Sequence, residues 1–341
     1  METKLLRVED PKQNPQAIET AAAILRRGGL VAIPTETVYG LGASAFDEQA
    51  VANIYKAKGR PSDNPLIVHI ASMETLPTLA REIPSGAYAL AEAFWPGPLT
   101  MILKKQPSVP SVTTGGLDTV AVRFPSHPVA NAIIRESGLP IAAPSANLSG
   151  APSPTNARRC VEDLTGRVDA IVDGGPCQVG LESTVISLAG EIPRLLRPGF
   201  VTLEQLCDVL GDVAVDSAVL SKLEEGQSAA SPGMKYKHYA PKARVILLDG
   251  DDDAFVDYVN RQQGDDIWAL AFGHETAALK KPYMVMGDTD QQQAQRLFEC
   301  LRALDDKGAK VIYARCPHKT GVGMAVYNRI IRASAFTIQK L

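Results

Sequence analysis

The chain has 341 residues, a formal net charge of -3 and a composition with 45% hydrophobic and 21% charged residues. These proportions are usual for folded globular proteins, so they exclude a disordered chain. The net negative charge gives no overall cationic field to attract nucleic acid, although it does not exclude a local basic cleft. A chain of this length has room for a large and a small domain, each with its own core.

The cysteines and the hydrophobic runs favour a cytoplasmic protein. The five cysteines form no CxxC pair and no zinc-ribbon spacing, so we expect reduced, buried thiols. They are Cys160, Cys177, Cys207, Cys300 and Cys316. No run approaches the ~18 apolar residues of a membrane-spanning helix. The N-terminal segment METKLLRVEDPKQ lacks the apolar core of a signal peptide.

Residues 1–211 mix helical and strand patterns, which predicts an α/β domain around a central sheet. Helical spacing with glycine stops or polar caps predicts helices over residues 16–27, 47–59, 127–137, 155–164 and 202–210. Short apolar or β-branched runs predict strands at 30–34, 65–71, 99–105, 119–125, 139–145, 169–175 and 183–188. The stretch TETVYGLG after the first of these strands is expected to be a loop.

Residues 212–242 show weak periodicity and are predicted to be a linker. From 243 to 341 strands and helices alternate, with strands at 244–249, 266–272 and 310–315 and helices up to 262, near 290–307 and from 322. This order predicts a small open sheet flanked by helices, as in doubly wound folds. No GxGxxG follows its first strand, so dinucleotide binding there is not expected.

The segment IPTETVYGLGASA places hydroxyl and acidic side chains directly after a strand. Gly40 and Gly42 would let the backbone come close to a ligand. The alternative is a tight turn in which Thr35 or Thr37 satisfies backbone groups.

The segment YKAKGRPSDNPL gathers Lys56, Lys58 and Arg60 at a helix end. Cations suit the negative end of the helix dipole, which is one explanation for them. Three cations that converge on a turn would also neutralise a polyphosphate. The two interpretations are equally supported by the sequence.

Arg123 lies inside an apolar strand, in TVAVRFPSHP. An unpaired buried cation is costly, so its partner should be a carboxylate or a phosphate. A protein carboxylate is one candidate, and a ligand carboxylate is the other.

The segment IAAPSANLSGAPSPT follows a strand with small and hydroxyl residues, among them Ser145, Asn147 and Ser153. Their backbone N–H groups and hydroxyls could surround an anion or a nucleotide. The alternative is a solvent loop with a helix cap at Thr155 or Asn156. Further strand ends add Ser183, Thr184 and Arg197.

The histidines and the missing motifs narrow the chemistry. His69 is expected to be a core histidine, and His127, His274 and His318 have no evident partners. The sequence contains no GxxxxGK[ST], GxSxG or HExxH. Hydroxyls, amides and cations remain, and these suit substrate positioning and charge neutralisation, as in nucleotidyl or phosphoryl transfer.

These segments together resemble the YrdC/Sua5 family. PTETVYGLG, KxKxR, NPLIVHI, VAVRFP, APSAN, ESTVI and LRPG occur in that family's order over about residues 15–210. SPGMKYKHYAP (231–241) resembles the linker of its two-domain, Sua5-type members. The resemblance implies a YrdC-like catalytic domain at 1–211 with a twisted mixed sheet and a large cleft. It further implies a linker at 212–242 and a small Rossmann-like C-terminal domain at 243–341.

The implied activity is L-threonylcarbamoyladenylate synthesis from L-threonine, bicarbonate or CO2, and ATP with Mg2+, releasing pyrophosphate. Downstream threonylcarbamoyl-transfer proteins would use the product for N6-threonylcarbamoyladenosine at position 37 of ANN-decoding tRNAs. A weak contact with tRNA itself is an added expectation. The resemblance implies no metal ligand among the protein side chains, because Mg2+ would be held by the ATP phosphates.

The resemblance also implies the site residues. The catalytic cations would be Lys56, Lys58 and Arg60. The threonine contacts would be Thr35, His69, Arg123, Ala143 and Ser183, with Arg123 on the carboxylate. The ATP contacts would be Lys58, Ser62, Thr119, Ser145, Asn147, Ser153, Arg197 and Tyr239.

The mixed anhydride product would hydrolyse in open water, so we expect the linker to cover the site as a gate that includes Tyr239. A structured spacer is the alternative for this segment. Two rival functions are RNA binding and carbamoyl-phosphate-dependent transfer. The acidic balance disfavours the first, and the absence of acylphosphatase-like and zinc-finger segments disfavours the second.

Overall fold

The computed structural model describes residues 2–219 and 239–341, which fall into two compact units. The first unit takes the chain up to residue 219, except for two short stretches. These stretches, Gly150–Pro152 and Val179–Leu181, belong with residues 239–341 in the second unit.

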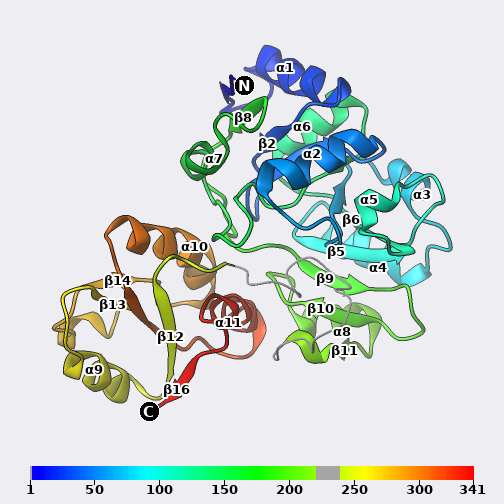
Figure 1. The fold of residues 1–341 in the computed structure, drawn as a ribbon. Coiled ribbons are helices and arrows are strands. Elements are labelled where there is room, and N and C mark those ends of the chain that lie inside the picture. Colours follow the sequence, from blue (N-terminus) through cyan, green and yellow to red (C-terminus); the bar gives the residue numbers. More distant parts are fainter. Residues whose placement is uncertain (1, 220–238) are drawn as a thin grey trace. The chain divides into compact units, whose positions relative to one another are not determined.

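The first unit is built on an eleven-stranded mixed sheet of order β1-β8-β2-β3-β7-β4-β6-β5-β9-β10-β11 (Figure 1). Its strands are β1 (Lys4–Arg7), β2 (Val31–Ile33), β3 (Gly40–Ser44), β4 (Ile67–His69), β5 (Leu99–Lys104), β6 (Thr119–Arg123), β7 (Ile141–Ala142), β8 (Ala170–Asp173), β9 (Thr184–Ser187), β10 (Arg194–Arg197) and β11 (Ala214–Val215). Strands remote in sequence are neighbours, so side chains from motifs far apart in the chain can meet across the sheet.

Several helices of the first unit begin and end at the residue types expected for caps. They are α1 (Pro15–Arg26), α2 (Glu48–Lys58), α3 (Leu76–Leu79), α4 (Ser85–Phe94), α5 (Ser111–Thr114), α6 (Pro128–Ser137), α7 (Ala157–Leu164) and α8 (Leu203–Leu210), with 3-10 turns η1 (Met73–Thr75) and η2 (Ser217–Val219). Asp47 caps α2 by accepting from the N–H groups of Gln49 and Ala50, and Gly59 ends it in the left-handed region (φ 62°). The side chain of Asn156 caps α7, as the sequence suggested.

The two faces of the central strands differ. Val68, Met101, Val122 and Ile186 are partners on neighbouring strands, point to one face and belong to the main hydrophobic core. On the other face, residues of the alternate register form a smaller apolar cluster that includes Ile67, Ile102 and Ala121. Polar residues of the same register continue this second face, so it is the face on which a site can be built.

The second unit is a five-stranded parallel sheet of order β14-β13-β15-β12-β16. Its elements are β12 (Arg244–Asp249), α9 (Asp252–Arg261), β13 (Ile267–Ala271), η3 (Thr276–Ala278), β14 (Tyr283–Val285), α10 (Asp290–Asp306), β15 (Val311–Arg315), α11 (Gly321–Ala333) and β16 (Ile338–Lys340). The predicted α/β fold with a small doubly wound C-terminal unit is therefore confirmed.

Several local predictions were wrong. Gly40 to Ser44 form β3 instead of a loop, because they pair antiparallel with β2. Gly42 is tight against a neighbouring strand, since a Cβ there would lie 2.8 Å from Ile141 Cγ2. Residues 214–219 of the predicted linker form β11 and η2. The proposed gate lies mostly at 220–238, outside the described residues.

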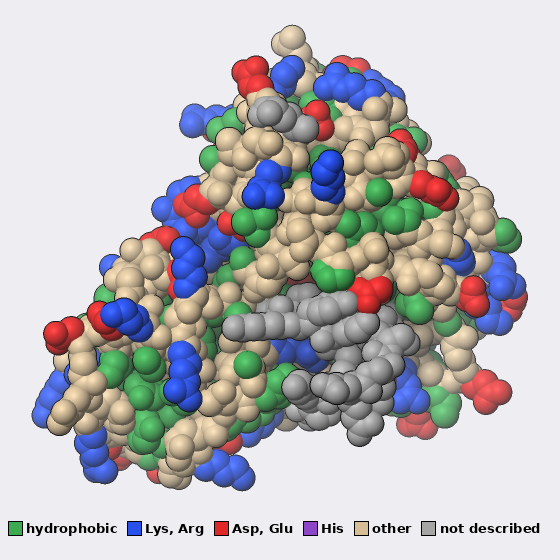
Figure 2. All heavy atoms as spheres, in the orientation of Figure 1, with side chains coloured by type: hydrophobic (Ala, Val, Ile, Leu, Met, Phe, Trp, Pro, Cys, Tyr) green, Lys and Arg blue, Asp and Glu red, His purple; other side chains and the backbone are tan. Residues whose placement is uncertain are grey.

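All five cysteines are free, as expected, but Cys207 is only half-buried. No helix in the described ranges is both long and apolar enough to cross a membrane. Figure 2 shows Lys and Arg side chains interspersed with Asp and Glu on the face that it draws, in keeping with the small net charge.

Candidate active site

A row of residues in register crosses five strands on the second face of the sheet. His69 on β4 is the partner of Arg123 on β6, and Arg123 is the partner of Thr100 on β5. Thr100 is the partner of Val185 on β9, which in turn is opposite Arg197 on β10, beside a register shift in that pair. Residues paired in regular register project to the same side of a sheet. Arg197 reaches this side too, because it donates to Ser183 Oγ, which lies 2.7 Å from Thr100 Oγ1. The row therefore brings three of the sequence-predicted residues, His69, Arg123 and Arg197, onto one surface.

Arg123 is 3% exposed and is held at three points. Its Nε donates to the carbonyl oxygen of Gly97 (3.3 Å) and its Nη1 to Thr37 Oγ1 (2.7 Å). Its Nη2 lies 2.6 Å from Oε1 of Glu36, which is itself only 5% exposed. The partner of the buried arginine is therefore a protein carboxylate, the first of the two candidates that the sequence left open.

The contact between Arg123 and Glu36 is close but poorly aligned. Neither Glu36 oxygen has a hydrogen bond of good geometry to a described residue. Burial is the largest single influence and pushes the pKa of Glu36 upward, but the charge and polar contact of Arg123 and the nearby backbone amides of Glu36 and Ser126 together hold that pKa below its usual range. Glu36 is thus ionised at neutral pH and balances the guanidinium charge.

Thr35 organises the turn that carries Glu36. Its Oγ1 donates to the carbonyl oxygen of Val38 (2.6 Å) and accepts from the N–H groups of Thr37 and Val38. The hydroxyls of Thr35 and Thr37 are 2.9 Å apart. The structural alternative for these threonines is therefore confirmed, and the predicted contact of Thr35 with threonine stays a prediction.

His69 is neutral at physiological pH. Burial first, and then the positive charge of Arg123, lower the pKa of its imidazole to about 3. Its Nδ1 lies 3.2 Å from the carbonyl oxygen of Ile67. The side chain can accept or donate one hydrogen bond to a ligand, but it carries no charge there.

Ser183 joins the row to the loop before β9. Its Oγ is 2.7 Å from Thr100 Oγ1, and Arg197 donates to it from Nη2 (3.2 Å) and to its carbonyl oxygen from Nε (3.0 Å). Arg197 is buried at the end of β10. Ser183 and Arg197, predicted on different substrates, are therefore direct neighbours.

Lys58 is fixed by the loop that follows β7. Its buried ammonium donates to the carbonyl oxygens of Ser145 and Asn147, and Ser145 Oγ donates to Asn147 Oδ1 (2.5 Å). The same loop is joined to the segment after β2 by Leu41 N–H to Pro144 O and Ala146 N–H to Tyr39 O, both 2.7 Å. Lys58, at the end of α2, and Arg123, at the end of β6, are thus held by two segments that are hydrogen-bonded to each other.

The loop amides are less available than the sequence suggested. The N–H of Ala146 donates to Tyr39, that of Leu148 to Asp163 Oδ2, and that of Ser149 to the carbonyl oxygen of Lys58. These three amides are therefore already engaged by protein acceptors, and the predicted role of the loop in binding an anion or a nucleotide stays a prediction.

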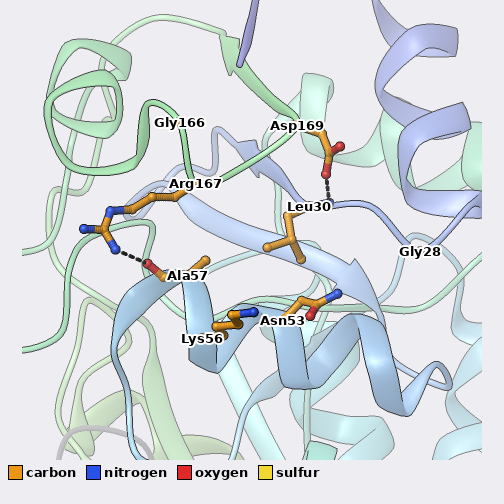
Figure 3. Close-up of a pocket in the computed structure, with 8 residues that line it drawn as sticks. All are labelled: Gly28, Leu30, Asn53, Lys56, Ala57, Gly166, Arg167 and Asp169. Atoms are coloured by element: carbon orange, nitrogen blue, oxygen red, sulfur yellow. Dashed lines mark hydrogen bonds between the residues drawn. The ribbon is translucent and has the colours of Figure 1, made fainter. Parts of the chain in front are cut away.

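The three cations at the end of α2 do not converge. Lys56 is exposed and lines a hollow of about 350 Å3 with Arg167 and Asp169 (Figure 3), whereas Lys58 is buried against the 145–147 turn. Positions two apart on a helix point in nearly opposite directions, which explains the split. Arg60 Nη2 donates to the carbonyl oxygens of Asn64 and Pro65.

The other predicted contacts are scattered. Ser153 is buried and donates to Glu182 Oε1 (2.5 Å), and Ala143 is buried beside β4. Ser62 is exposed and Thr119 is half-buried at the start of β6. In the second unit Tyr239 adopts a positive φ of 62° and its ring stacks on Phe298, with centroids 5.2 Å apart. Its predicted contact with the nucleotide stays a prediction.

The sequence reasoning missed two members of the site, and it also missed the partners of three histidines. Glu36 stood between two threonines in a motif that was already singled out, and Thr100 was a lone hydroxyl in the apolar run LTMILKK. The remaining histidines do have partners: His127 caps α6, His274 contacts Asp252 and Asp288, and His318 contacts Asp290.

The fold and the row of buried cations and hydroxyls define a two-unit α/β protein with a polar surface suited to anionic or zwitterionic ligands. Comparison with known families assigns it further. The Sua5/YciO/YrdC family model, whose description is telomere recombination, matches residues 23–199. A second model, the C-terminal domain of threonylcarbamoyl-AMP synthase, matches residues 201–335. The chain belongs to the Sua5/YciO/YrdC family.

Relatives match over the whole chain. Threonylcarbamoyl-AMP synthase of Pyrococcus abyssi is 48% identical over 95% of this chain and 96% of its own. The Bacillus subtilis protein of the same name is 47% identical over 94% of both. The crystal structure of P. abyssi Sua5 complexed with L-threonine superposes with a TM-score of 0.93, at 46% identity and full coverage of both chains.

Proposed function

We propose that the chain is a threonylcarbamoyl-AMP synthase, a nucleotidyltransferase that forms L-threonylcarbamoyladenylate and pyrophosphate from L-threonine, bicarbonate or CO2, and ATP. The observation that carries the proposal is the row across the sheet. It sets groups suited to an amino acid (His69, Arg123 and Ser183) directly beside Arg197, a cation suited to a phosphate. The names of the full-length relatives support the same activity.

Arg123 suits a substrate carboxylate. Hydrogen bonds to Gly97 and Thr37 fix the plane of its guanidinium and use two of its five N–H donors, so donors remain for a ligand. Glu36 keeps the buried cation balanced before a ligand arrives. Neutral His69 adds a hydrogen bond without adding to the charge around the substrate.

The reaction then needs alignment more than a protein nucleophile. The amine of threonine and CO2 form a carbamate, one oxygen of which attacks the α-phosphorus of ATP as pyrophosphate leaves. Lys58, whose ammonium is held by the loop after β7, and Arg197 are the cations that suit the phosphates. Binding both substrates on one surface supplies the proximity on which the rate depends.

We propose that Mg2+ enters with ATP and not on a protein ligand set. The two buried carboxylates of this region are engaged, Glu36 with Arg123 and Glu182 with Ser153. A Mg2+ ion on the triphosphate would spread the charge that develops as pyrophosphate leaves. We further propose that the product passes to tRNA threonylcarbamoyl-transfer proteins in the cytoplasm, where free cysteines are stable.

The test is mass-spectrometric detection of threonylcarbamoyl adenylate after the chain is mixed with ATP, Mg2+, L-threonine and bicarbonate. Product and pyrophosphate should appear together, and omission of threonine or of bicarbonate should abolish both. Arg123→Lys is the informative variant, because lysine keeps the charge and loses the planar fork. ATP hydrolysis that proceeds equally well without threonine would contradict the proposal.

A further inference from the structure

A cavity of about 500 Å3 lies in the second unit, away from every residue assigned above. It opens at the carboxyl ends of the parallel strands β12, β13 and β15, and it is in the size range of small-molecule sites. The argument uses six of its lining residues: Asp249, Asp252, His274, Asp288, Gln293 and Arg315.

The topology marks this edge as a place for a ligand. β12 and β15 are neighbours, but the chain leaves β12 toward β13 and leaves β15 in the opposite direction toward β16. Right-handed crossovers then put α9 on one face of the sheet and α11 on the other (Figure 1). The loops diverge at this point, and open α/β sheets bind ligands in the crevice that such a divergence creates.

The wall of the cavity is organised by one buried arginine. Arg315 donates from Nε to Glu275 Oε1 (2.5 Å), from Nη2 to Asp252 Oδ1 (2.8 Å) and from Nη1 to the carbonyl oxygen of Gly250 (2.6 Å). Glu275 is fully buried behind it. Arg315 therefore ties together the loops after β12, β13 and β15, and its donors are not directed to an anionic ligand.

Carboxylates are prominent in the lining. The pKa values of Asp249, Asp252 and Asp288 all lie below their usual range, chiefly through hydrogen bonds from Lys319, Arg315 and His274 respectively. The cations Arg315 and Lys319 and the imidazole of His274, whose pKa is raised chiefly by Asp288, balance these three carboxylates. The wall therefore has no excess of positive charge for a phosphate-rich ligand, while the exposed carboxylate of Asp288 can accept hydrogen bonds from a ligand ammonium.

Gln293 independently points to a hydrogen-bond donor on the ligand. Its side chain is 1% exposed and lines the cavity, and its Nε2 donates to the carbonyl oxygen of Gly287 (3.4 Å). Its Oε1 accepts no hydrogen bond from any described residue. A buried acceptor without a donor costs about 1–3 kcal/mol, and a ligand N–H would remove that cost.

A metal ion fits the cavity less well. Ligand atoms of Asp252, His274 and Glu275 lie within 4.8 Å of one another. However, the guanidinium of Arg315 occupies the space between Asp252 and Glu275. Both ring nitrogens of His274 face carboxylates, Nδ1 at 3.0 Å from Asp288 and Nε2 at 3.2 Å from Asp252, so no lone pair is directed to a metal.

We propose that this cavity is a binding site for a small organic amine, whose ammonium group is held by the Asp288 carboxylate and Gln293 Oε1. Ammonium donors satisfy both groups, and the ammonium charge is complementary to the Asp288 carboxylate. A diamine and the side chain of a basic amino acid share this chemistry. The inference does not depend on the activity of the first unit.

The test is calorimetric titration of the full chain at physiological ionic strength with 1,4-diaminobutane and, separately, L-lysine. The uncharged 1,4-butanediol is the control ligand. Saturable binding of either amine, with no binding of the diol, is the expected result. The amine that binds shows whether the cavity accepts a diamine or a basic amino acid. Gln293→Leu and Asp288→Asn should each weaken binding by about tenfold, the loss of one good polar contact. Asp265→Asn, an exposed aspartate of the same unit, should change nothing.

Absence of heat with both amines would overturn the proposal. So would equal weakening in the Asp265→Asn variant, which would mean diffuse attraction to surface charge. Binding of Mn2+ or inorganic phosphate in place of the amines would also overturn it. If the Gln293→Leu variant does not fold, Asp288→Asn still tests the proposal, because the Asp288 side chain is exposed at the mouth of the cavity and its replacement should not affect folding.

Discussion

Glu36→Gln should destabilise the first unit strongly, although glutamine has nearly the same size. The variant removes the negative charge 2.6 Å from Arg123 Nη2 and leaves a buried guanidinium without a counter-ion. At a charge separation of about 4 Å and an effective dielectric constant of about 20, the lost attraction is about 4 kcal/mol. The smaller desolvation of neutral glutamine offsets part of it. We expect the free energy of unfolding to fall by about 3 kcal/mol.

The assay should report on the first unit alone. The chain has two tryptophans, and Trp95, buried with its Nε1 donating to Leu99, lies in the first unit. Trp268→Phe therefore leaves a single fluorophore whose change in urea follows that unit. Glu82→Gln is the matched control, because Glu82 is an exposed partner of Lys104 and should contribute little.

The pH dependence gives a second check on Glu36. Its pKa is lowered in the folded protein, so its stabilising contribution is complete above the unfolded value of about 4.3. The contribution is lost as the pH falls through the folded value. The stability difference between wild type and Glu36→Gln should therefore be constant from pH 6 to 8 and shrink below about pH 4. A difference below about 1 kcal/mol, or one that is the same at all pH values, would refute the buried ion pair.

Three further predictions concern single contacts. Lys58→Ala should reduce the rate of adenylate formation in steady-state assays by at least about 100-fold, in the range for a lost charge-stabilising group. Lys56 lines a separate hollow, so Lys56→Ala should change that rate less than about threefold. Equal losses in the two variants would contradict the separate placement of the two lysines. Gly42→Ala should cost about 1–3 kcal/mol by overpacking against Ile141, while Gly190→Ala, with open space around it, should be neutral in urea titrations. The pKa of His69 is lowered to about 3 in the folded protein, whereas the unfolded value is about 6.5. Because the unfolded chain then binds the proton more tightly, the free energy of unfolding should fall as the pH decreases below 6.5. An imidazole NMR signal of His69 in the folded protein that titrates near 6.5 would contradict this prediction.

Local patterns in the sequence predicted the elements well because each depends on nearby residues. Periodicity and caps located α1, α2, α6 and α10 to within a few residues, and the alternation of strands and helices predicted the small open C-terminal sheet flanked by helices. The strand β3 was missed because Gly40 and Gly42 have low strand propensity. Ile141 of β7 lies tightly against Gly42, and Ala143, just after β7, lies close to Gly40, so the small residues answer a tertiary requirement.

The site was harder to predict than the elements, since its geometry depends on strand order. His69, Arg123, Thr100 and Arg197 are far apart in sequence, and no local signal says that β4, β6, β5 and β10 align these four residues. The sequence left Arg123 with two candidate partners, because burial demands an opposite charge but does not say where it comes from. Glu36 was overlooked for the same reason, although it lies in a segment that was singled out.

The pairing of Arg123 with Glu36 changes how the predicted carboxylate contact should be understood. A buried arginine with no protein partner would depend on its ligand for stability, and the empty site would collapse or admit water. With Glu36 in place the charge is balanced in advance, while the misaligned contact leaves Nη2 without a hydrogen bond of good geometry. The two candidate partners are therefore compatible: Glu36 supplies the charge balance, and a ligand carboxylate would supply the aligned hydrogen bonds. Such an arrangement keeps the site preorganised at the cost of some attraction for the ligand, which is the balance expected of a site that must also release its product.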